Sequence, residues 1–178
     1  MWEKEYLYIN YVFIKGDWFM GIRSAAKAVI INNGKILLNK CEDKHNGDYY
    51  SLPGGGQNQY ETLYEAVVRE CLEETGYTVI PERFAALCEE ICMNEEFREK
   101  YPDYSHKMYH IFICKLANEE IKIPTEKDSM QINSEWVEIE TIKEIRILPK
   151  LFGDNFQGIL NKTTPIFLGS EHILYNHG

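Results

Sequence analysis

A helix with both of its ends marked in the sequence constrains the fold of this 178-residue chain most. Thr62 and Glu65 have the spacing of a capping box, in which each side chain bonds the backbone N–H of the other residue. Gly76 stands where a left-handed cap ends a helix. These signals predict a helix over residues 63–75. The preceding run Pro53-Gly54-Gly55-Gly56 predicts a loop whose backbone can approach another group closely.

Strand and turn signals surround this helix. Residues 25–31 and 35–39 flank Asn32-Asn33-Gly34, which tolerates the positive φ of a tight hairpin turn. Further strands are expected over 49–52, 78–80, 85–92, 107–116 and 134–138. A second helical region is expected from Thr141 to Leu160, broken near Pro149, and a charged loop or short helix over 94–105. The order of elements predicts an α/β fold with helices packed on a mixed sheet.

Composition narrows the class of protein. The chain has 19 Lys and Arg against 28 Asp and Glu, a net charge of −9, which argues against binding to nucleic acid or an anionic membrane. The five cysteines are odd in number and scattered, so we expect reduced thiols and a cytoplasmic protein. The sequence contains no apolar run of membrane length.

Three carboxylates share one face of the predicted helix. Glu70, Glu73 and Glu74 stand at i, i+3 and i+4, so their side chains fall within about 60° either way of Glu70. Like charges at this spacing repel each other unless solvent or a cation relieves them. Carboxylate oxygens on a rigid element are the ligands that Mg²⁺ or Mn²⁺ prefers. Taken alone, however, such a cluster is more typical of a solvated helix face.

The spacing around these glutamates is more specific than the cluster itself. Gly55 is followed after five residues by Glu61, and after seven more by Arg69-Glu70-Cys71-Leu72-Glu73-Glu74-Thr75-Gly76-Tyr77. This pattern resembles the Nudix box of the Nudix hydrolase family. Two departures are visible: Cys71 occupies an aliphatic position, and Tyr60 stands where a glycine is often found. Neither departure removes a charged group.

The resemblance extends from about residue 22 to 150 and implies a Nudix-type α/β/α sandwich with a mixed β-sheet. Residues 1–22 then form an aromatic-rich extension, and 23–178 form the Nudix hydrolase domain with its C-terminal helical region. The implied activity is hydrolysis of a pyrophosphate bond in a nucleoside diphosphate linked to another moiety. Nucleotide sugars, ADP-ribose and nucleoside triphosphates are all candidate substrates.

The resemblance also assigns roles within the box. The implied catalytic residues are Glu70, Glu73 and Glu74, which with the main-chain carbonyl of Gly55 hold Mg²⁺ or Mn²⁺. Glu61 and Arg69 are expected to brace the box loop against the helix. The general base stays open, because it varies within the family. We favour Glu70, and the alternatives outside the helix are Glu89, Glu90, Glu126 and Asp128.

Substrate contacts are less well marked. Arg23 and Lys40 flank the first hairpin and are expected to bind phosphate, and Arg98 and Lys107 are further candidates. The candidate platforms for a base are Trp18, Phe19, Tyr49 and Tyr50, for which a half-buried strand face or a dimer interface is the alternative. We expect no special role for the histidines His45, His106 and His110.

Two further questions stay open at the level of sequence. The alternative function is a Nudix-fold domain that binds or senses a nucleotide without cleaving it, although such domains commonly lose box glutamates. Action on RNA ends is disfavoured by the net charge of −9. A homodimer formed through the aromatic residues of 2–19 is a hypothesis.

Overall fold

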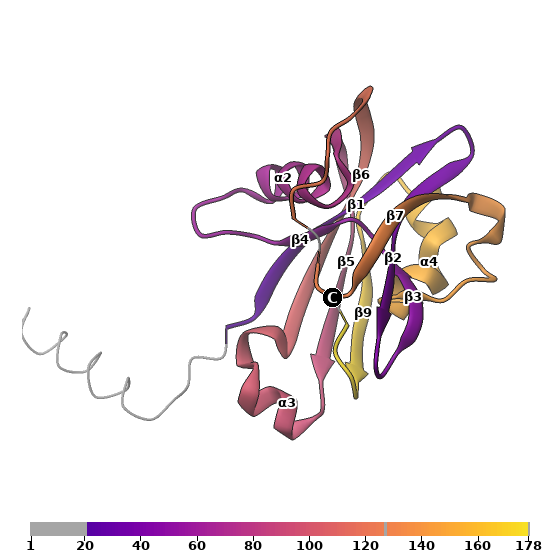
Figure 1. The fold of residues 1–178 in the computed structure, drawn as a ribbon. Helices are drawn as coiled ribbons and strands as arrows, with labels where there is room; N and C mark the ends of the chain where they lie inside the picture. The colour runs from indigo at the N-terminus through magenta and orange to yellow at the C-terminus, as the bar shows by residue number, and fades with distance from the viewer. Residues whose placement is uncertain (1–20, 127, 178) are drawn as a thin grey trace, which may run out of the picture.

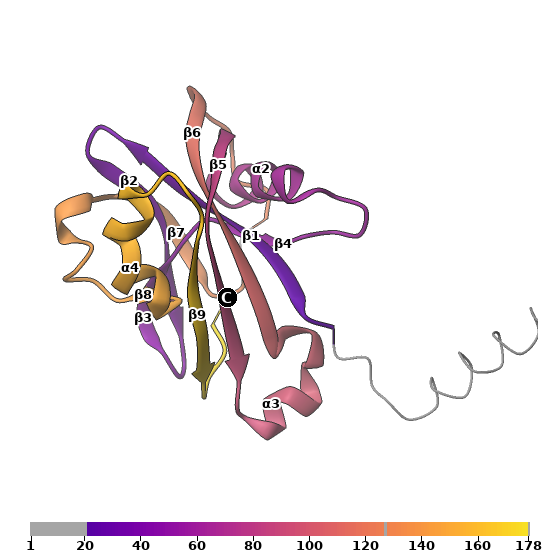
Figure 2. The ribbon, with the colours of Figure 1, turned by 180° about the vertical axis from the view of Figure 1, so that it is seen from behind.

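The computed structural model describes residues 21–126 and 128–177, which form a curled, mixed β-sheet with helices on both faces (Figures 1 and 2). The strand order is β8-β3-β2-β1-β6-β5-β9, with β4 also paired to β1 and β7 to β2. The strands are β1 (Arg23–Asn32), β2 (Lys35–Asp43), β3 (Gly47–Ser51), β4 (Gly54–Gly56), β5 (Tyr77–Cys92), β6 (His106–Ile121), β7 (Gln131–Glu138), β8 (Ile147–Leu148) and β9 (Ile166–Ile173). The helices are α2 (Leu63–Thr75), α3 (Glu95–Lys100) and α4 (Lys150–Asn161), with 3-10 turns at Pro102–Tyr104 and Ile139–Thr141. The expected aromatic strands of residues 1–22, with Trp18 and Phe19, lie almost entirely outside the described residues.

Both strand directions occur in the sheet. β1 runs parallel to β6, β5 to β9 and β3 to β8, whereas the remaining pairs are antiparallel. Helix α2 packs against one face of this sheet and α4 against the other. The expected α/β/α sandwich with a mixed sheet is therefore confirmed.

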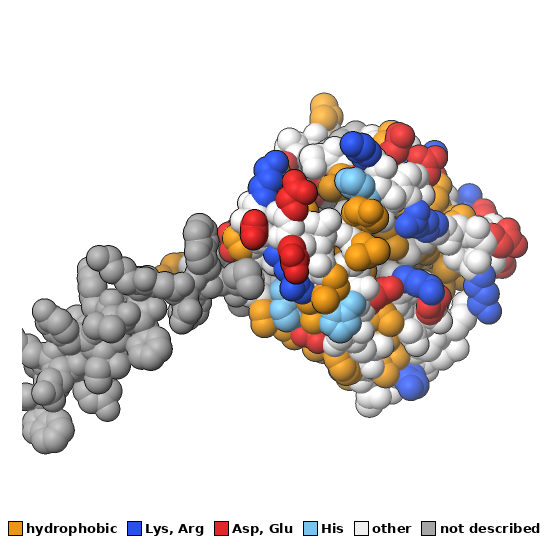
Figure 3. Space-filling view, turned by 90° about the horizontal axis from the view of Figure 1, so that it is seen from below, with side chains coloured by type: hydrophobic (Ala, Val, Ile, Leu, Met, Phe, Trp, Pro, Cys, Tyr) orange, Lys and Arg blue, Asp and Glu red, His pale blue; other side chains and the backbone are white. Residues whose placement is uncertain are grey.

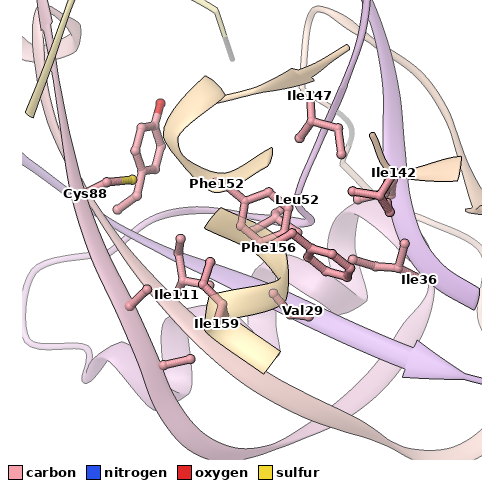
Figure 4. Packing of buried hydrophobic residues seen from close by; sticks show 14 of the residues in the cluster. Val29, Ile36, Leu52, Cys88, Ile111, Ile142, Ile147, Phe152, Phe156 and Ile159 are labelled. Carbon is pink, nitrogen blue, oxygen red and sulfur yellow. The ribbon is translucent and has the colours of Figure 1, made fainter. Parts of the chain in front are cut away.

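Two hydrophobic clusters hold these layers together. On one face, Ala66, Val67 and Cys71 of α2 are fully buried against alanines and Ile30 of β1. On the other face, α4 contributes Phe152, Phe156 and Ile159, which point toward residues of the sheet (Figure 4). Each large apolar side chain buried in this way stabilises the fold by about 2 kcal/mol. Cys71 thus fills a buried apolar position, as its place in the box suggested.

Helix α2 begins and ends as its capping residues predict. The backbone N–H of Glu65 donates to Thr62 Oγ1 at 3.2 Å, and the backbone N–H of Thr62 donates to Glu65 Oε2 at 2.8 Å. Gly76 has φ 77° and donates its N–H to Leu72 O. A Cβ at Gly76 would also collide with Lys122 O, so two constraints favour glycine at this position.

The strands differ from the sequence prediction in several places. Gly54–Gly56, which was expected to be part of a loop, forms the short strand β4, because its backbone pairs with β1. The expected strands 78–80 and 85–92 are parts of one long strand, β5, because bulges near Pro81 and Phe84 absorb the proline without ending the strand. β6 continues to Ile121, five residues beyond the predicted end. β9 was not predicted, because a central Gly169 with φ 110° followed by Ser170, Glu171 and His172 interrupts its apolar pattern.

The expected helical stretch 141–150 is wrong. This segment contains a 3-10 turn and the short strand β8, and α4 starts only at Lys150, with Pro149 as its N-cap. A proline disfavours helical geometry in the residue before it, so a helix can begin after Pro149 but not run through it. The charged segment 94–105 does contain the expected short helix, α3.

None of the helices formed by residues 21–126 and 128–177 is long and apolar enough to span a membrane.

Figure 3 views the molecule from below, the end of the sheet where α3 lies. Acidic, basic and hydrophobic side chains are interspersed over this face.

Candidate functional site

The glycine strand β4 brings the box loop against both β1 and α2. β4 pairs antiparallel with β1, with Gly55 opposite Ala26. A Cβ at Gly55 would collide with the carboxylate of Glu70, and a Cβ at Gly56 would collide with the guanidinium of Arg23. Gly54 has φ 124°, in the left-handed region. Glycine is required at position 54, where a Cβ would also meet the backbone oxygen of Ala26, whereas a Cβ at positions 55 and 56 would displace the charged side chains.

Arg69 ties the loop to the helix. Its Nε and Nη2 donate to the two carboxylate oxygens of Glu61 at 2.8 Å each, and Nη2 also donates to Gly56 O at 2.9 Å. Nη1 donates to Glu70 Oε1 at 2.6 Å and to Glu73 Oε2 at 3.1 Å. The hydrogen bonds to Glu61 raise the pKa of Arg69 and lower that of Glu61. This arrangement can brace the loop as the resemblance implies.

Glu74 is the buried member of the carboxylate cluster, with 7% of its surface exposed. Its Oε2 accepts hydrogen bonds from Asn39 Nδ2 and from the backbone N–H of Gly54, both at 2.8 Å. Burial raises the pKa of Glu74 to about 7, and the nearby Lys27 ammonium opposes this rise. Lys27 in turn donates to Gly54 O. Burial and these donors hold Glu74 in one orientation at the base of the site.

The other glutamates face a cavity of about 360 Å³. Its lining residues are Arg23, Gly55, Gly56, Gln57, Asn58, Arg69, Glu70, Glu73, Glu74, Glu126 and Asp128. The loop that carries Glu126 is fixed to α2, because the backbone N–H groups of Thr125 and Glu126 donate to Glu73 O at 3.0 and 3.2 Å. Five carboxylates therefore line a cavity that has two arginines as its cations.

This donor set suits a hard divalent cation. Carboxylate oxygens that outnumber the cations around them are typical ligands for Mg²⁺ or Mn²⁺. In residues 21–126 and 128–177, no three acidic, histidine or cysteine side chains are already gathered into a ligand set. Arg69 Nη1 instead lies between Glu70 and Glu73. A cation held here would therefore use Glu70 and Glu73 after they shift from Arg69, together with Glu74 or the loop carboxylates.

A second, larger cavity of about 640 Å³ adjoins the first and shares five of its lining residues. The shared residues are Arg23, Gly55, Gly56, Glu126 and Asp128. The parallel pairing of β1 with β6 sets Arg23 beside Lys107, and Lys27 projects from the same face of β1 as Arg23. Three cations thus line this cavity.

Aromatic rings complete the larger cavity. Its aromatic lining residues are Phe97, Tyr101, Tyr104 and Tyr109. The Arg23 guanidinium lies 4.6 Å from the centre of the Tyr104 ring, and the Lys27 and Lys107 ammonium groups lie 6.0 and 5.8 Å from that of Tyr109. Burial lowers the pKa of Lys107 to about 8. Cations and rings of this kind can bind phosphates and a planar or sugar group together.

The sequence-predicted site residues divide between those inside and outside these cavities. Glu70, Glu73, Glu74 and Gly55 lie together in the smaller cavity, where Arg23 joins them. Lys40 lines neither cavity: its neighbour Asn39 points to Glu74, and alternate residues of a strand point to opposite faces.

The remaining sequence-predicted candidates also divide into residues that line a cavity and residues that do not. Lys107, Glu126 and Asp128 line the larger cavity. Glu90 instead pairs with His177 and Glu89 with His106, so neither lines the two cavities.

The other candidates for phosphate and base contacts have different partners. Arg98 donates to Cys92 O, Tyr49 Oη bonds Met130 Sδ at 3.3 Å, and Tyr50 Oη bonds Glu135 at 2.5 Å. None of these three lines the two cavities.

Sequence reasoning missed Lys27, Asn39, Tyr104 and Asn176. Lys27 is the one cation inside the apolar run of residues 25–31, and that mismatch was an available signal. Asn39, Tyr104 and Asn176 offered no signal, because each reaches the site only through tertiary pairing. Asn39 is further held by Ser134 Oγ, which donates to its Oδ1 at 2.7 Å.

Comparisons with known proteins agree with this architecture. Putative nudix hydrolase 1 of Caenorhabditis elegans is 28% identical over 127 residues, which are 69% of this chain and 30% of that protein. The chain thus spans about a third of the length of that relative. The MutT protein of Methanosarcina mazei Go1 matches with a TM-score of 0.61 at 25% identity, over 80% of this chain and 96% of that one. An ADP-ribose pyrophosphatase of Streptococcus suis matches with a TM-score of 0.56 at 21% identity, over 83% and 99%.

A family model of the NUDIX domain matches residues 21–154. This range is well over half of the chain and contains the whole box, with the glycine strand, the capped helix and the five cavity carboxylates. The chain therefore belongs to the NUDIX family.

Proposed function

We propose that this chain hydrolyses a pyrophosphate bond in a nucleoside diphosphate linked to another moiety, with Mg²⁺ or Mn²⁺ as cofactor. The observation that carries the proposal is that a cavity rich in carboxylates adjoins one in which cations outnumber carboxylates, with five lining residues in common. A diphosphate needs cations on one side and, for cleavage, a metal-binding carboxylate set on the other. Both lie in adjoining cavities of this chain.

Different residues would bind the phosphates and hold the metal ion. Arg23, Lys27 and Lys107 would bind phosphate oxygens and orient the diphosphate toward the glutamates. A cation held by Glu70, Glu73 and Glu74 would neutralise phosphate charge and make a water molecule easier to deprotonate. Water then attacks one phosphorus, the anhydride P–O bond breaks, and the other phosphate leaves with the bond's electron pair.

Glu70 is our candidate for the base that accepts the proton of this water. Its carboxylate lines the smaller cavity, accepts a hydrogen bond from Arg69 Nη1 and lies close to Gly55. Glu126 and Asp128 also line the cavity and are the alternatives. Glu90 is a weaker alternative, because its carboxylate is engaged with His177.

The substrate class stays broad. The structural relatives include an ADP-ribose pyrophosphatase and a MutT protein, and ADP-ribose, nucleotide sugars and nucleoside triphosphates all contain the required linkage. A chain that binds a nucleotide without cleaving it is the alternative function. The presence of all three box glutamates in one cavity favours hydrolysis over that alternative.

A product assay tests the proposal. The purified chain is incubated with Mg²⁺ and a panel of nucleotide sugars, ADP-ribose, dinucleoside polyphosphates and nucleoside triphosphates, with Glu74→Gln as the control variant. Glutamine can still accept the hydrogen bonds from Asn39 and Gly54, so this variant should fold. Cleavage by the wild type alone supports the proposal. Binding without cleavage by the wild type favours the sensing function, and unchanged turnover in Glu74→Gln removes Glu74 from the metal site.

A further inference from the structure

Residues 174–177 follow β9 and lie beyond the part of the chain that matches the family model. β9 runs parallel to β5, with Ile173 opposite Cys92, so the chain leaves the sheet at the end where α3 begins. Figures 1 and 2 show the end of the chain close to β5 and β9. This segment places Asn176 in the wall of the larger cavity.

The segment is held from both sides of the cavity. On the β5 side, Met93 donates its backbone N–H to Ile173 O at 2.7 Å. On the side of the β2–β3 turn, the rings of Tyr175 and His45 stack with centroids 4.4 Å apart and planes 3° from parallel. The segment therefore bridges two parts of the sheet.

Buried polar contacts fix its last residues. His177 Nε2 lies 2.5 Å from Glu90 Oε1, with only 3% and 1% of the two side chains exposed. Lys107 Nζ donates to His177 O, and Asn46 Nδ2 donates to Asn176 O at 3.3 Å. These contacts fix the backbone of Asn176, a residue that lines the larger cavity.

Asn176 lies at the end of the larger cavity away from the glutamates. A third cavity of about 540 Å³ shares Phe97, Tyr101, Met130 and Asn176 with the larger one. The third cavity shares no lining residue with the carboxylate cavity. A diphosphate placed near the glutamates would therefore direct its attached group toward Asn176.

The side-chain oxygen of Asn176 lacks the partner that its burial requires. Its Oδ1 is buried and accepts no hydrogen bond from any residue within 21–126 and 128–177. A buried amide oxygen without a donor costs free energy, and a bound molecule that brings an N–H or O–H removes this cost. A donor on the substrate is thus the missing partner.

We propose that Asn176 is a specificity-determining residue that accepts a hydrogen bond from a base N–H or a sugar O–H of the substrate, beyond its diphosphate. The inference rests on the proposed function, because that function places the diphosphate between the glutamates and the cations. Residues 174–177 then select among substrates that the box glutamates alone would treat alike.

Steady-state kinetics of the full chain with Mg²⁺ test this inference. The variants are Asn176→Leu, which removes the acceptor at similar size, and Asn176→Asp, which keeps an acceptor oxygen. Asn118→Leu is the matched control, because Asn118 is exposed near the end of β6 and outside all three cavities. The substrates form two series, one with the base varied at constant sugar and one with the sugar varied at constant base.

Asn176→Leu should raise KM about tenfold for substrates that carry the donor, with kcat within about twofold of the wild type. Asn176→Asp should keep the order of substrate preference, and Asn118→Leu should behave as the wild type. The series in which selectivity collapses identifies the donor as base or sugar. The inference is overturned if Asn176→Leu leaves selectivity unchanged, or if it lowers kcat equally for all substrates along with the thermal midpoint.

Failure of the proposed function is distinguishable from failure of this inference. A wild type without turnover on any substrate overturns hydrolysis, and the same variants are then compared by calorimetric binding of ADP-ribose and UDP-glucose. Weaker binding to Asn176→Leu alone supports the inference in a sensing protein. Equal binding to both proteins, or no binding to the wild type, overturns it.

Discussion

The two ends of the substrate cavity are built in opposite ways. The carboxylate end comes mostly from one continuous stretch, β4 through α2, in which Arg69 reaches Glu61, Glu70 and Glu73 within eight residues of itself. The far end draws on β1, β6, the segment of α3 and its 3-10 turn, and residues 174–177. Local spacing can encode the first end, whereas only the pairing of distant strands creates the second.

The ends also differ in charge. Five carboxylates against two arginines line the smaller cavity, whereas in the larger one three cations outnumber two carboxylates. One end is therefore suited to a cation and the other to the anionic part of a substrate. Changes at the first end should affect turnover, and changes at the second should affect binding and selectivity.

The largest effect should come from Glu70→Gln at the carboxylate end. Removing the proposed base should lower kcat about a thousandfold, with little change in KM for the substrate. Stopped assays with saturating substrate and Mg²⁺ measure this loss. Glu138→Gln is the control, since Glu138 is exposed and pairs with Lys35 on the surface. A kcat within threefold of the wild type would move the base to Glu126 or Asp128.

Arg69→Lys should be the next largest. Lysine keeps the charge but cannot make the paired bonds to Glu61 together with those to Glu70, Glu73 and Gly56 O. We expect kcat to fall about a hundredfold and the free energy of unfolding to fall by about 2 kcal/mol. Urea denaturation and the product assay measure the two effects. Arg146→Lys, at an exposed site outside both cavities, should change neither.

The contrast between the two ends explains what the sequence could predict. Thr62, Glu65 and Gly76 act on backbone atoms within four residues, so the bounds of α2 followed directly from the sequence. Lys40 was expected at the site from its place in the first hairpin, but strand alternation turns it away from the Asn39 side. Lys27 reaches the cavity through the pairing of β1 with both β4 and β6.

Whole elements whose partners are distant in the chain were also missed by the sequence prediction. β9 and the contacts of His177 depend on partners in β5 and β6 that are 70 or more residues away in the chain. The local periodicity of a sequence cannot predict contacts between segments so far apart in the chain. Likewise, the sequence predicted two strands, 78–80 and 85–92, but bulges in the pairing with β6 allow one continuous β5 that includes Pro81.

At the far end, Lys107→Met should make substrate binding independent of pH near pH 8. Burial lowers the folded-state pKa of Lys107 to about 8, so its positive charge is present below that pH and is lost as the pH rises through it. In the wild type, KM should therefore rise as the pH passes from 7 to 9. The variant should have a KM about tenfold higher at pH 7 and no such rise.

Measurement of KM at half-unit pH steps from pH 7 to pH 9 tests whether KM rises in the wild type and stays constant in the variant. Lys115→Met serves as the control, because Lys115 is exposed and pairs with Glu82 away from the cavities. A rise in KM that persists in Lys107→Met would assign the titration to another group.

Glu90→Gln should have a smaller effect, on stability rather than turnover. Burial raises the pKa of Glu90, but His177 and Lys107 outweigh it and hold the pKa below its ordinary value of 4.5. The carboxylate therefore stabilises the folded state above pH 4.5, and this contribution is lost as the pH falls through the folded-state pKa. Glu90→Gln should lower the free energy of unfolding by about 1 kcal/mol at pH 7. It should also reduce the loss of stability toward acid pH, which we call the acid limb of the stability curve.

Urea midpoints between pH 3 and pH 7 measure this change. An exposed carboxylate, Glu138, provides the comparison as Glu138→Gln, which should leave the acid limb unchanged. An identical acid limb in Glu90→Gln and the wild type would show that the buried pair does not set the pH dependence.

The smallest effect should come from replacing Tyr60, which lies in the loop before α2 and has a strained backbone conformation. Tyr60 has φ 68° and 97% of its surface exposed, so its side chain gains little from packing while its backbone occupies the left-handed region. Left-handed geometry costs a residue with a Cβ about 1 kcal/mol, part of which glycine regains in spite of its greater freedom when unfolded. Tyr60→Gly should therefore raise the free energy of unfolding by about 0.5 kcal/mol. Tyr60→Ala removes the same ring but keeps the Cβ, so equal stabilisation in both variants would trace the gain to the exposed ring rather than to the backbone.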